Sequence, residues 1–185
     1  MIPITSLWLP ILLSAVAVFI ASSIIHMVLQ YHKGDYAKLA SEDEVLAAMR
    51  EAGVQPGSYY FPNCIEPKDL ATPEMQEKFK AGPVGFMTVV PNGVPAMGKQ
   101  LGSWFVYSVV VSACVAYLAT RTMAAGTDYL AVFRVIGTTA FLAYGFAHVS
   151  DSIWKGQSWG SAFKHLLDGL IYGCVTGGVF GWLWP

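Results

Sequence analysis

Four apolar stretches, separated by polar segments, dominate the pattern along this chain. The first covers residues 7–25 and carries no charge, and the others cover residues 101–120, 129–149 and 161–184. An apolar helix of about 20 residues is long enough to cross the hydrocarbon core of a bilayer. The pattern therefore predicts an all-α membrane protein with four transmembrane helices in an antiparallel bundle.

The first apolar stretch also resembles the core of a cleaved signal peptide. No lysine or arginine precedes it, however, and it is longer than the apolar core of a signal peptide. We therefore interpret residues 1–30 as the first transmembrane helix, and residues 101–185 as helices two to four.

Residues 31–100 differ in composition, because nine of the twelve acidic residues and most of the lysines lie there. Ser41 begins a capping-box pattern and Thr72 precedes a proline, so two short helices are expected in this extramembrane segment. The uncharged stretch 82–97 is either interfacial or re-entrant, and the pattern leaves both open.

The last apolar stretch carries a glycine at every fourth position. Residues four apart share one face of a helix, so these glycines form a bare stripe, or glycine zipper, on which a second membrane helix packs closely. The helix predicted at 101–120 carries small residues at the same spacing, and we expect it to be the partner. The packing residues are Gly169, Gly173, Gly177 and Gly181 on one helix, and Ser108, Ser112 and Ala116 on the other.

The basic residues predict the orientation in the membrane. Lysine and arginine are concentrated between residues 33 and 99, and few lie in the loops on the opposite side. The positive-inside rule then places residues 31–100 in the cytoplasm and both termini outside, in a bacterial inner (plasma) membrane. Arg134, about one turn into the third helix, is expected to extend its side chain to the headgroups.

Antiparallel crossings place His26, His148 and His165 at similar depth on three helices, with His32 following at the same face. Ionisable groups inside a membrane are costly and mark candidate functional sites. Imidazoles from two helices are able to ligate haem iron or a pigment, so these three histidines are candidate cofactor ligands.

A structural interpretation of the same polar groups stays open. Lys164 and Asp168 are four residues apart and are able to pair along one helix. Asp168, Asp151 and Arg134 would then be polar residues at the membrane edge. No metal ligand is assigned, because no metal-binding motif is recognisable.

Several function classes are excluded by composition and motifs. A net charge of −1 over 185 residues gives no electrostatic basis for binding nucleic acid. The three cysteines form neither a disulfide framework nor a zinc knuckle. P-loop, dinucleotide-binding, HExxH and GxSxG patterns are absent from the sequence, and no catalytic residue is assigned.

The C-terminal third of the chain resembles a class of small, uncharacterised bacterial four-helix integral membrane proteins. The residues that carry the resemblance lie within 134–185: Ser152-Ile153-Trp154, Trp159, Asp168 to Tyr172, and Gly181-Trp182. The resemblance implies the four-helix fold, and it implies no reaction and no site residues.

Three functions are consistent with these patterns. The first is a non-catalytic accessory or structural subunit that contacts lipids and packs with other membrane subunits or with copies of itself. The second is a haem- or pigment-carrying subunit of an electron-transfer or light-harvesting complex. The third is a small transporter or channel gated by Asp168 or His165.

Overall fold

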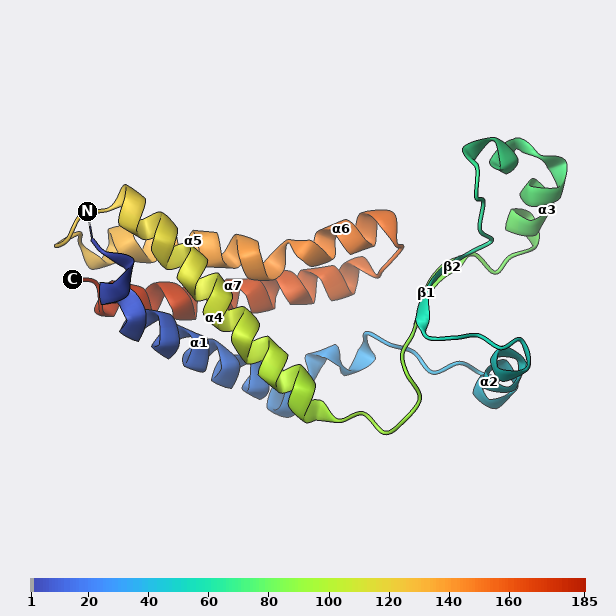
Figure 1. Cartoon of the computed structure of the whole chain (residues 1–185), viewed down its shortest axis with the longest axis horizontal. Coiled ribbons are helices and arrows are strands. Elements are labelled where there is room, and N and C mark those ends of the chain that lie inside the picture. The colour runs from blue at the N-terminus through green and yellow to red at the C-terminus, as the bar shows by residue number, and fades with distance from the viewer. Residues whose placement is uncertain (1) are drawn as a thin grey trace. The chain divides into compact units, whose positions relative to one another are not determined.

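The computed structural model describes residues 2–185, which are mostly helical (Figure 1). The helices are α1 (Trp8–Ser23), α2 (Glu42–Glu51), α3 (Pro73–Ala81), α4 (Met97–Thr122), α5 (Tyr129–Gly145), α6 (Ala147–Trp154) and α7 (Trp159–Trp182). The two strands are β1 (Gly57–Phe61) and β2 (Gly85–Val89). Short 3₁₀ or π-helical turns cover Ile4–Leu7, Ile24–Leu29, Tyr31–Gly34 and Pro67–Ala71.

Three helical segments are long and apolar enough to cross a membrane: Ile4–Leu29, Met97–Thr122 and Tyr129–Trp154. They coincide with the first three apolar stretches of the sequence. The helix α7 has 24 residues, but Lys164, His165 and Asp168 lie in its first half. A fourth span is therefore not established by length and composition.

The chain divides into two compact units. The first contains residues 1–36 and 96–185, and the second contains residues 37–95. Residues 31–36, which the sequence analysis grouped with the extramembrane segment, pack with the helices of the first unit.

Buried serines join α1 to α4 in the first unit. Ser14 Oγ and Ser112 Oγ lie 3.0 Å apart, and Trp104 Nε1 donates a hydrogen bond of 2.9 Å to Ser22 Oγ. The later residue of α1 thus meets the earlier residue of α4, so the two helices run antiparallel.

The glycine stripe of α7 lies against the backbone of α5. A Cβ added at Gly173 would lie 2.7 Å from the carbonyl oxygen of Gly137, and one at Gly169 would lie 2.6 Å from Cα of Gly145. Real Cβ contacts are not this short, so any larger residue there would push the two helices apart. Gly177 and Gly181 make equally close approaches to α5.

The partner predicted for the glycine stripe is therefore wrong. Ser108, Ser112 and Ala116 are fully buried, but the stripe faces α5, whereas Ser112 bonds to Ser14 of α1. The physical reason is that α5 carries its own glycines at the contact, which permit a closer approach than the serines of α4.

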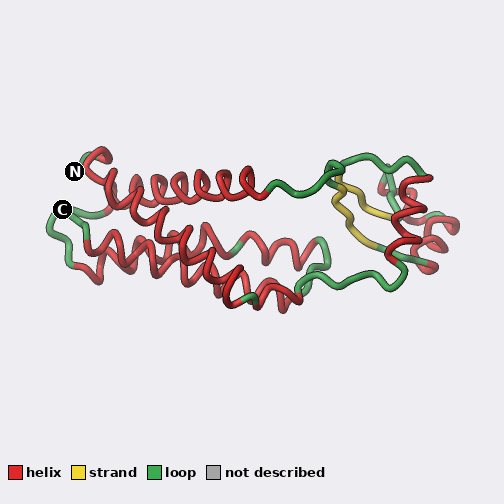
Figure 2. The backbone as a smooth tube through the Cα atoms, turned by 90° about the horizontal axis from the view of Figure 1, so that it is seen from below, coloured by secondary structure: helices red, strands yellow, loops and turns green. Residues whose placement is uncertain are grey.

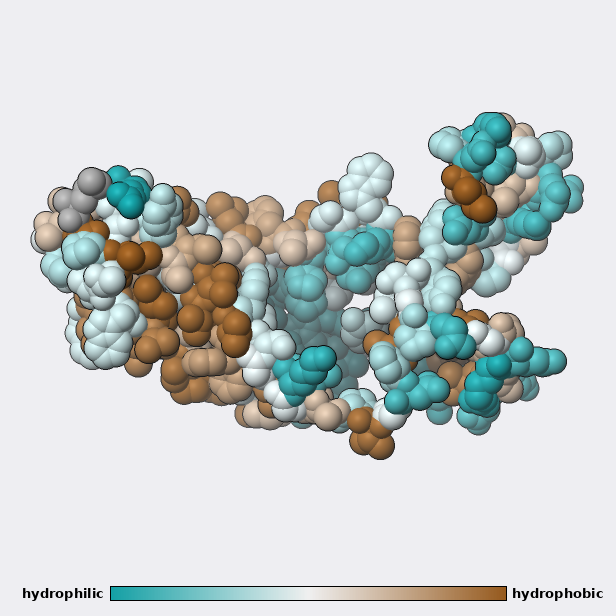
Figure 3. Space-filling view, viewed as in Figure 1, coloured by the Kyte–Doolittle hydropathy of each residue, from teal (hydrophilic) through white to brown (hydrophobic). Residues whose placement is uncertain are grey.

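Hydrophobic side chains cover much of the first unit on the face seen in Figure 3. Leu12, Ile20, Val106, Val110 and Leu142 are among the large apolar residues exposed on its helices. Apolar exposure of this extent is unusual for a protein in water and fits helices that contact lipid.

The second unit contains the two short helices and a two-stranded antiparallel sheet (Figure 2). Thr72 caps α3 as predicted, since its Oγ1 accepts a hydrogen bond from the Met75 amide. Ser41 precedes α2 without making the side-chain hydrogen bond of a capping box.

Residues 82–97, for which the sequence left an interfacial and a re-entrant arrangement open, contain the strand β2. It pairs with β1, with Gly57 opposite Val89 and Phe61 opposite Gly85, so this stretch forms a sheet in the second unit. The strand β1 was not predicted, because prolines at positions 56 and 62 signal breaks on both sides of it.

Candidate functional site

All four histidines of the chain meet at one end of the first unit. The rings of His26 and His32 stack with centroids 4.9 Å apart, and the rings of His32 and His165 are 4.6 Å apart. His148 stacks on His165 at 3.7 Å. Four separate segments thus contribute to one continuous column of imidazoles.

A backbone reversal at Gln30 brings His32 back to this column. Gln30 has φ +50° and ψ +24°, a left-handed conformation that is uncommon for a residue other than glycine. Its N–H donates to the carbonyl oxygen of Ile25, which ends the π-helical turn. The chain then folds back, so that Tyr31, His32 and Asp35 contact α7.

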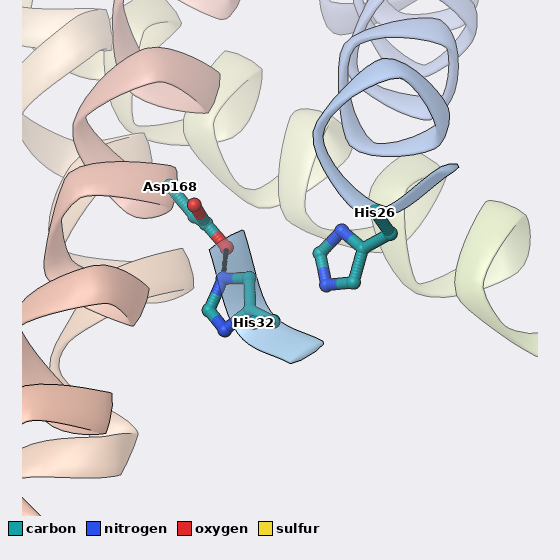
Figure 4. Close-up of side chains that lie close together, drawn as sticks. All are labelled: His26, His32 and Asp168. Carbon is teal, nitrogen blue, oxygen red and sulfur yellow. Dashed lines mark hydrogen bonds and ion pairs between the residues drawn. The ribbon is translucent and has the colours of Figure 1, made fainter. Parts of the chain in front are cut away.

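Asp168 of α7 lies beside the imidazole column, at one edge of His32, and is only 3% exposed. His32 Nε2 lies 2.8 Å from one carboxylate oxygen (Figure 4). The Tyr31 hydroxyl donates a hydrogen bond to the other oxygen. Burial and this bond to a carboxylate raise the pKa of Tyr31, so its phenol stays protonated and keeps donating. A buried carboxylate is tolerated only with such partners.

Asp35 forms a second carboxylate site on the other edge of His32. His32 Nδ1 and Ser161 Oγ lie 2.6 and 3.1 Å from one oxygen, and Lys164 Nζ lies 2.5 Å from the other. Burial alone would raise the pKa of Asp35, but its bonds to Lys164, His32 and Ser161 outweigh burial and lower that pKa to about 2. Asp35 is therefore ionised at neutral pH.

The predicted pairing of Lys164 with Asp168 is wrong. The ammonium of Lys164 binds Asp35 instead, and Asp168 is bound by Tyr31 and His32. The reason is the reversal at Gln30, which supplies closer partners for both groups than the neighbouring turn of α7.

The other predicted polar residues divide into two groups. His26, His148, His165 and Asp168 come together in the cluster. By contrast, Asp151 pairs with Lys155 along α6 at 2.7 Å, and Arg134 is exposed on α5.

Tyr31, Asp35 and Lys164 were not assigned to the site from sequence, and His32 was noted only as lying at the same face. The available signal was the short spacing from His26 to Asp35, just beyond the end of the first apolar stretch.

Two overlapping sets of side chains have the composition of a metal site. One set is His26, His32 and Asp168, and the other is His32, Asp35 and His165; within each set the ligand atoms lie within 4.8 Å of one another. Each set offers two imidazoles and one carboxylate, which suits zinc and related divalent transition metals. Ligand atoms around a tetrahedral zinc ion lie about 3.3 Å apart, so either set would have to contract by about 1.5 Å or less. The stacked rings of each set would also have to rotate, so that their in-plane lone pairs converge on one ion.

His26 has the outer hydrogen bond expected of a metal ligand. Its Nδ1 lies 3.0 Å from the carbonyl oxygen of Ser22, which only accepts hydrogen bonds. Nδ1 therefore carries the proton, and the lone pair of Nε2 is available. A bond of this kind fixes the tautomer and the orientation of a metal-binding histidine.

A planar macrocycle fits this arrangement less well than an ion. The rings of His148 and His165 are 13° from parallel with centroids 3.7 Å apart, which is direct contact and leaves no space between them for haem or a pigment.

Comparison with known proteins found no matching family model, no similar curated protein and no similar solved structure.

Proposed function

We propose that this protein is a multi-span membrane protein that binds one divalent transition-metal ion between His26, His32 and Asp168. The supporting observation is the convergence of every histidine of the chain with Asp168, which is buried, and with Asp35, whose side chain is 7% exposed. A buried carboxylate at the end of apolar helices is costly, and a metal ion supplies a reason to keep it there. The donor set favours zinc or a chemically similar ion.

The membrane arrangement that we propose has four spans. The helix α7 is the fourth, because its polar first half packs against His32 and Asp35. The lysine distribution places the second unit in the cytoplasm and both termini outside, which puts the metal centre at the cytoplasmic face of a bacterial inner membrane. Cys64 of the second unit should then react with an impermeant maleimide only after the membrane is permeabilised; labelling in intact cells would reject this orientation.

Metal content tests the proposed function directly. Protein purified in detergent without chelator should contain about one ion per chain, and metal-free protein should bind added Zn²⁺ in calorimetry. Replacing a ligand, as in Asp168→Asn or His26→Ala, should weaken the affinity for Zn²⁺. The loss should exceed the 10–100-fold that is typical when a residue that only hydrogen-bonds to a ligand is replaced.

Asp151→Asn is the matched control, because Asp151 lies outside both ligand sets and pairs only along α6. It should bind Zn²⁺ like the wild type. Absence of binding by the wild type, or equal affinity of the Asp168 and Asp151 variants, would contradict the proposal. An absorption spectrum with a Soret or pigment band would favour the cofactor-carrying alternative instead.

An accessory-subunit function remains a second proposal, and α2 favours it. Val45 and Leu46 on α2 are both exposed, although five of the ten residues of this helix are charged. A further membrane subunit or a second copy of the chain would cover them. Native mass spectrometry after gentle solubilisation should show that complex, and a lone monomer would count against it.

A further inference from the structure

We infer that Lys164 limits the metal centre to one ion, because its side chain neutralises the second ligand set, His32, Asp35 and His165. This inference rests on the proposed metal-binding function and concerns the number of ions that the cluster accepts.

The two ligand sets differ in their counter-charge and not in their donors. Both contain two imidazoles and one carboxylate, and the side chains of Asp168 and Asp35 are 4% and 7% exposed. In the second set the ammonium of Lys164 lies 2.5 Å from Asp35 Oδ1. Among residues 2–185, the ion pairs of Asp168 are with His32 and His165, and neither lysine nor arginine pairs with it. Asp168 is thus paired only with imidazoles, which can give up a proton to a metal ion, whereas an ammonium keeps its charge.

A fixed ammonium so close to Asp35 disfavours a second ion in two ways. It cancels the negative charge that would attract the ion, and it repels a divalent cation over a few ångströms. Both effects act at short range on Asp35, whose side chain is only 7% exposed, so that water screens its charge less than at an open surface. Lys164 is attached to α7 through its own backbone and cannot diffuse away.

With one ion bound, the second set acquires a different role. His32 would release to water the Nε2 proton that it donates to Asp168, and would ligate through that nitrogen, while Nδ1 keeps its proton and donates it to Asp35. Asp35 is held in turn by Lys164 and Ser161. This is a carboxylate–histidine–metal arrangement, in which the outer carboxylate orients the ligand. Asp35 and Lys164 are therefore positioning residues for the first ion.

Removing the ammonium should open the second set. In Lys164→Met, Asp35 keeps its charge and loses its counter-ion, so His32, Asp35 and His165 become able to hold a second ion. His32 would then also lose its Nδ1 proton to water and bridge the two ions as an imidazolate. Lys164→Arg keeps the charge and should keep the limit of one ion.

The experiment counts ions per chain after dialysis against Zn²⁺. We expect one ion for the wild type, for Lys164→Arg and for Lys155→Met, which removes a lysine from the ion pair on α6. We expect two ions for Lys164→Met, and one again for the double variant Lys164→Met/Asp35→Asn. After loading with Cu²⁺, the two ions of Lys164→Met should couple through His32, so that its EPR signal per copper falls below that of the wild type.

The outcomes separate this inference from the proposed function. Zero ions in the wild type would reject the metal centre itself, and the inference with it. One ion in both the wild type and Lys164→Met would overturn the inference alone, as would two ions in the wild type. Loss of all metal from Lys164→Met would overturn it too, because Lys164 would then be required for the first ion. An undiminished EPR signal would place the second ion away from His32, and would overturn it as well.

Discussion

Two consecutive residues of α7 take part in contacts of opposite kinds. Asp168 binds Tyr31 and His32 through its charge, whereas Gly169 contacts α5 because it has no side chain. The polar cluster consists of the four histidines with Tyr31, Asp35, Lys164 and Asp168, and it depends on protons, ions and hydrogen-bond partners. The glycine contact depends only on shape.

This difference separates the consequences of mutation. A change in the glycine contact should lower stability and leave the metal affinity of intact protein unchanged. A change in the polar cluster should alter both.

Asp168→Leu should destabilise the metal-free protein by about 3 kcal/mol, because removing one member of a buried charged pair strands its partners. The stranded groups are the Tyr31 hydroxyl and His32 Nε2. Asp151→Leu, which breaks only a partly exposed pair along α6, should cost roughly 0.5 kcal/mol or less. Denaturation in detergent with a chelator measures both, and equal losses would show that the cluster does not stabilise the fold.

Gly173→Ala should lower the stability of the fold, whereas Gly178→Ala should raise it. The new Cβ at Gly173 would meet the Gly137 carbonyl oxygen at 2.7 Å, which forces the helices apart and costs about 1–3 kcal/mol. The Cβ at Gly178 would have its nearest contact at 3.7 Å, so alanine should stabilise that helix by up to about 1 kcal/mol. Gly173→Leu should cost at least as much as Gly173→Ala.

Thermal unfolding in detergent and zinc calorimetry should be run together on these glycine variants. Unchanged stability of Gly173→Ala would mean that the contact between α5 and α7 is not tight. A zinc affinity that falls together with stability would mean that the glycine contact and the metal site are not independent.

The glycine contact shows what could be predicted from one helix alone. The stripe on residues 169–181 was recognisable because its spacing is local. The partner helix of the stripe was not recognisable. Ser108, Ser112 and Ala116 have the spacing of small residues on a packing face, but this spacing does not show which helix they pack against. The decision depends on Gly137 and Gly145 of α5, whose register against α7 is set by the tertiary fold.

Only the part of the polar cluster that follows from the order and direction of the helices was predictable from the sequence. Alternating helix directions were enough to bring His26, His148 and His165 to one end. The contributions of His32 and Asp35 depend on the left-handed residue Gln30, and glutamine gives no sequence signal for that conformation. The pairing of Lys164 with Asp35 follows from the same reversal.

Acid should weaken the polar cluster through Asp35. The pKa of Asp35 is about 2 in the folded protein and 3.8 as an ordinary carboxyl. The stability that Asp35 contributes is thus fully present above about pH 4, and is lost as the pH falls toward 2. In metal-free protein the unfolding temperature of the wild type should fall more steeply over this range than that of Asp35→Asn. Parallel curves for the two proteins would contradict this.

The contact between α1 and α4 contains a pair of buried hydroxyl groups. It depends either on their hydrogen bond, like the polar cluster, or on the small size of serine, like the glycine contact. Ser14 and Ser112 are fully buried and bond across the helices at 3.0 Å. Hydrogen bonds between membrane helices average about 0.6 kcal/mol, so Ser112→Ala should cost about that amount. The cost stays small because Ser14 also has the carbonyl oxygen of Ile11 within reach.

Ser108→Ala is the matched control for Ser112→Ala, since Ser108 is equally buried one turn earlier and bonds to the Trp104 carbonyl of its own helix. The difference between the two variants, measured by unfolding in detergent, isolates the bond between helices. A loss confined to Ser112→Ala, with zinc affinity unchanged, would mean that α1 and α4 are joined by a specific polar bond that is independent of the metal centre. Equal effects of the two variants would mean that the serines act through their small size, and the α1–α4 contact would then depend on shape, like the contact between α5 and α7.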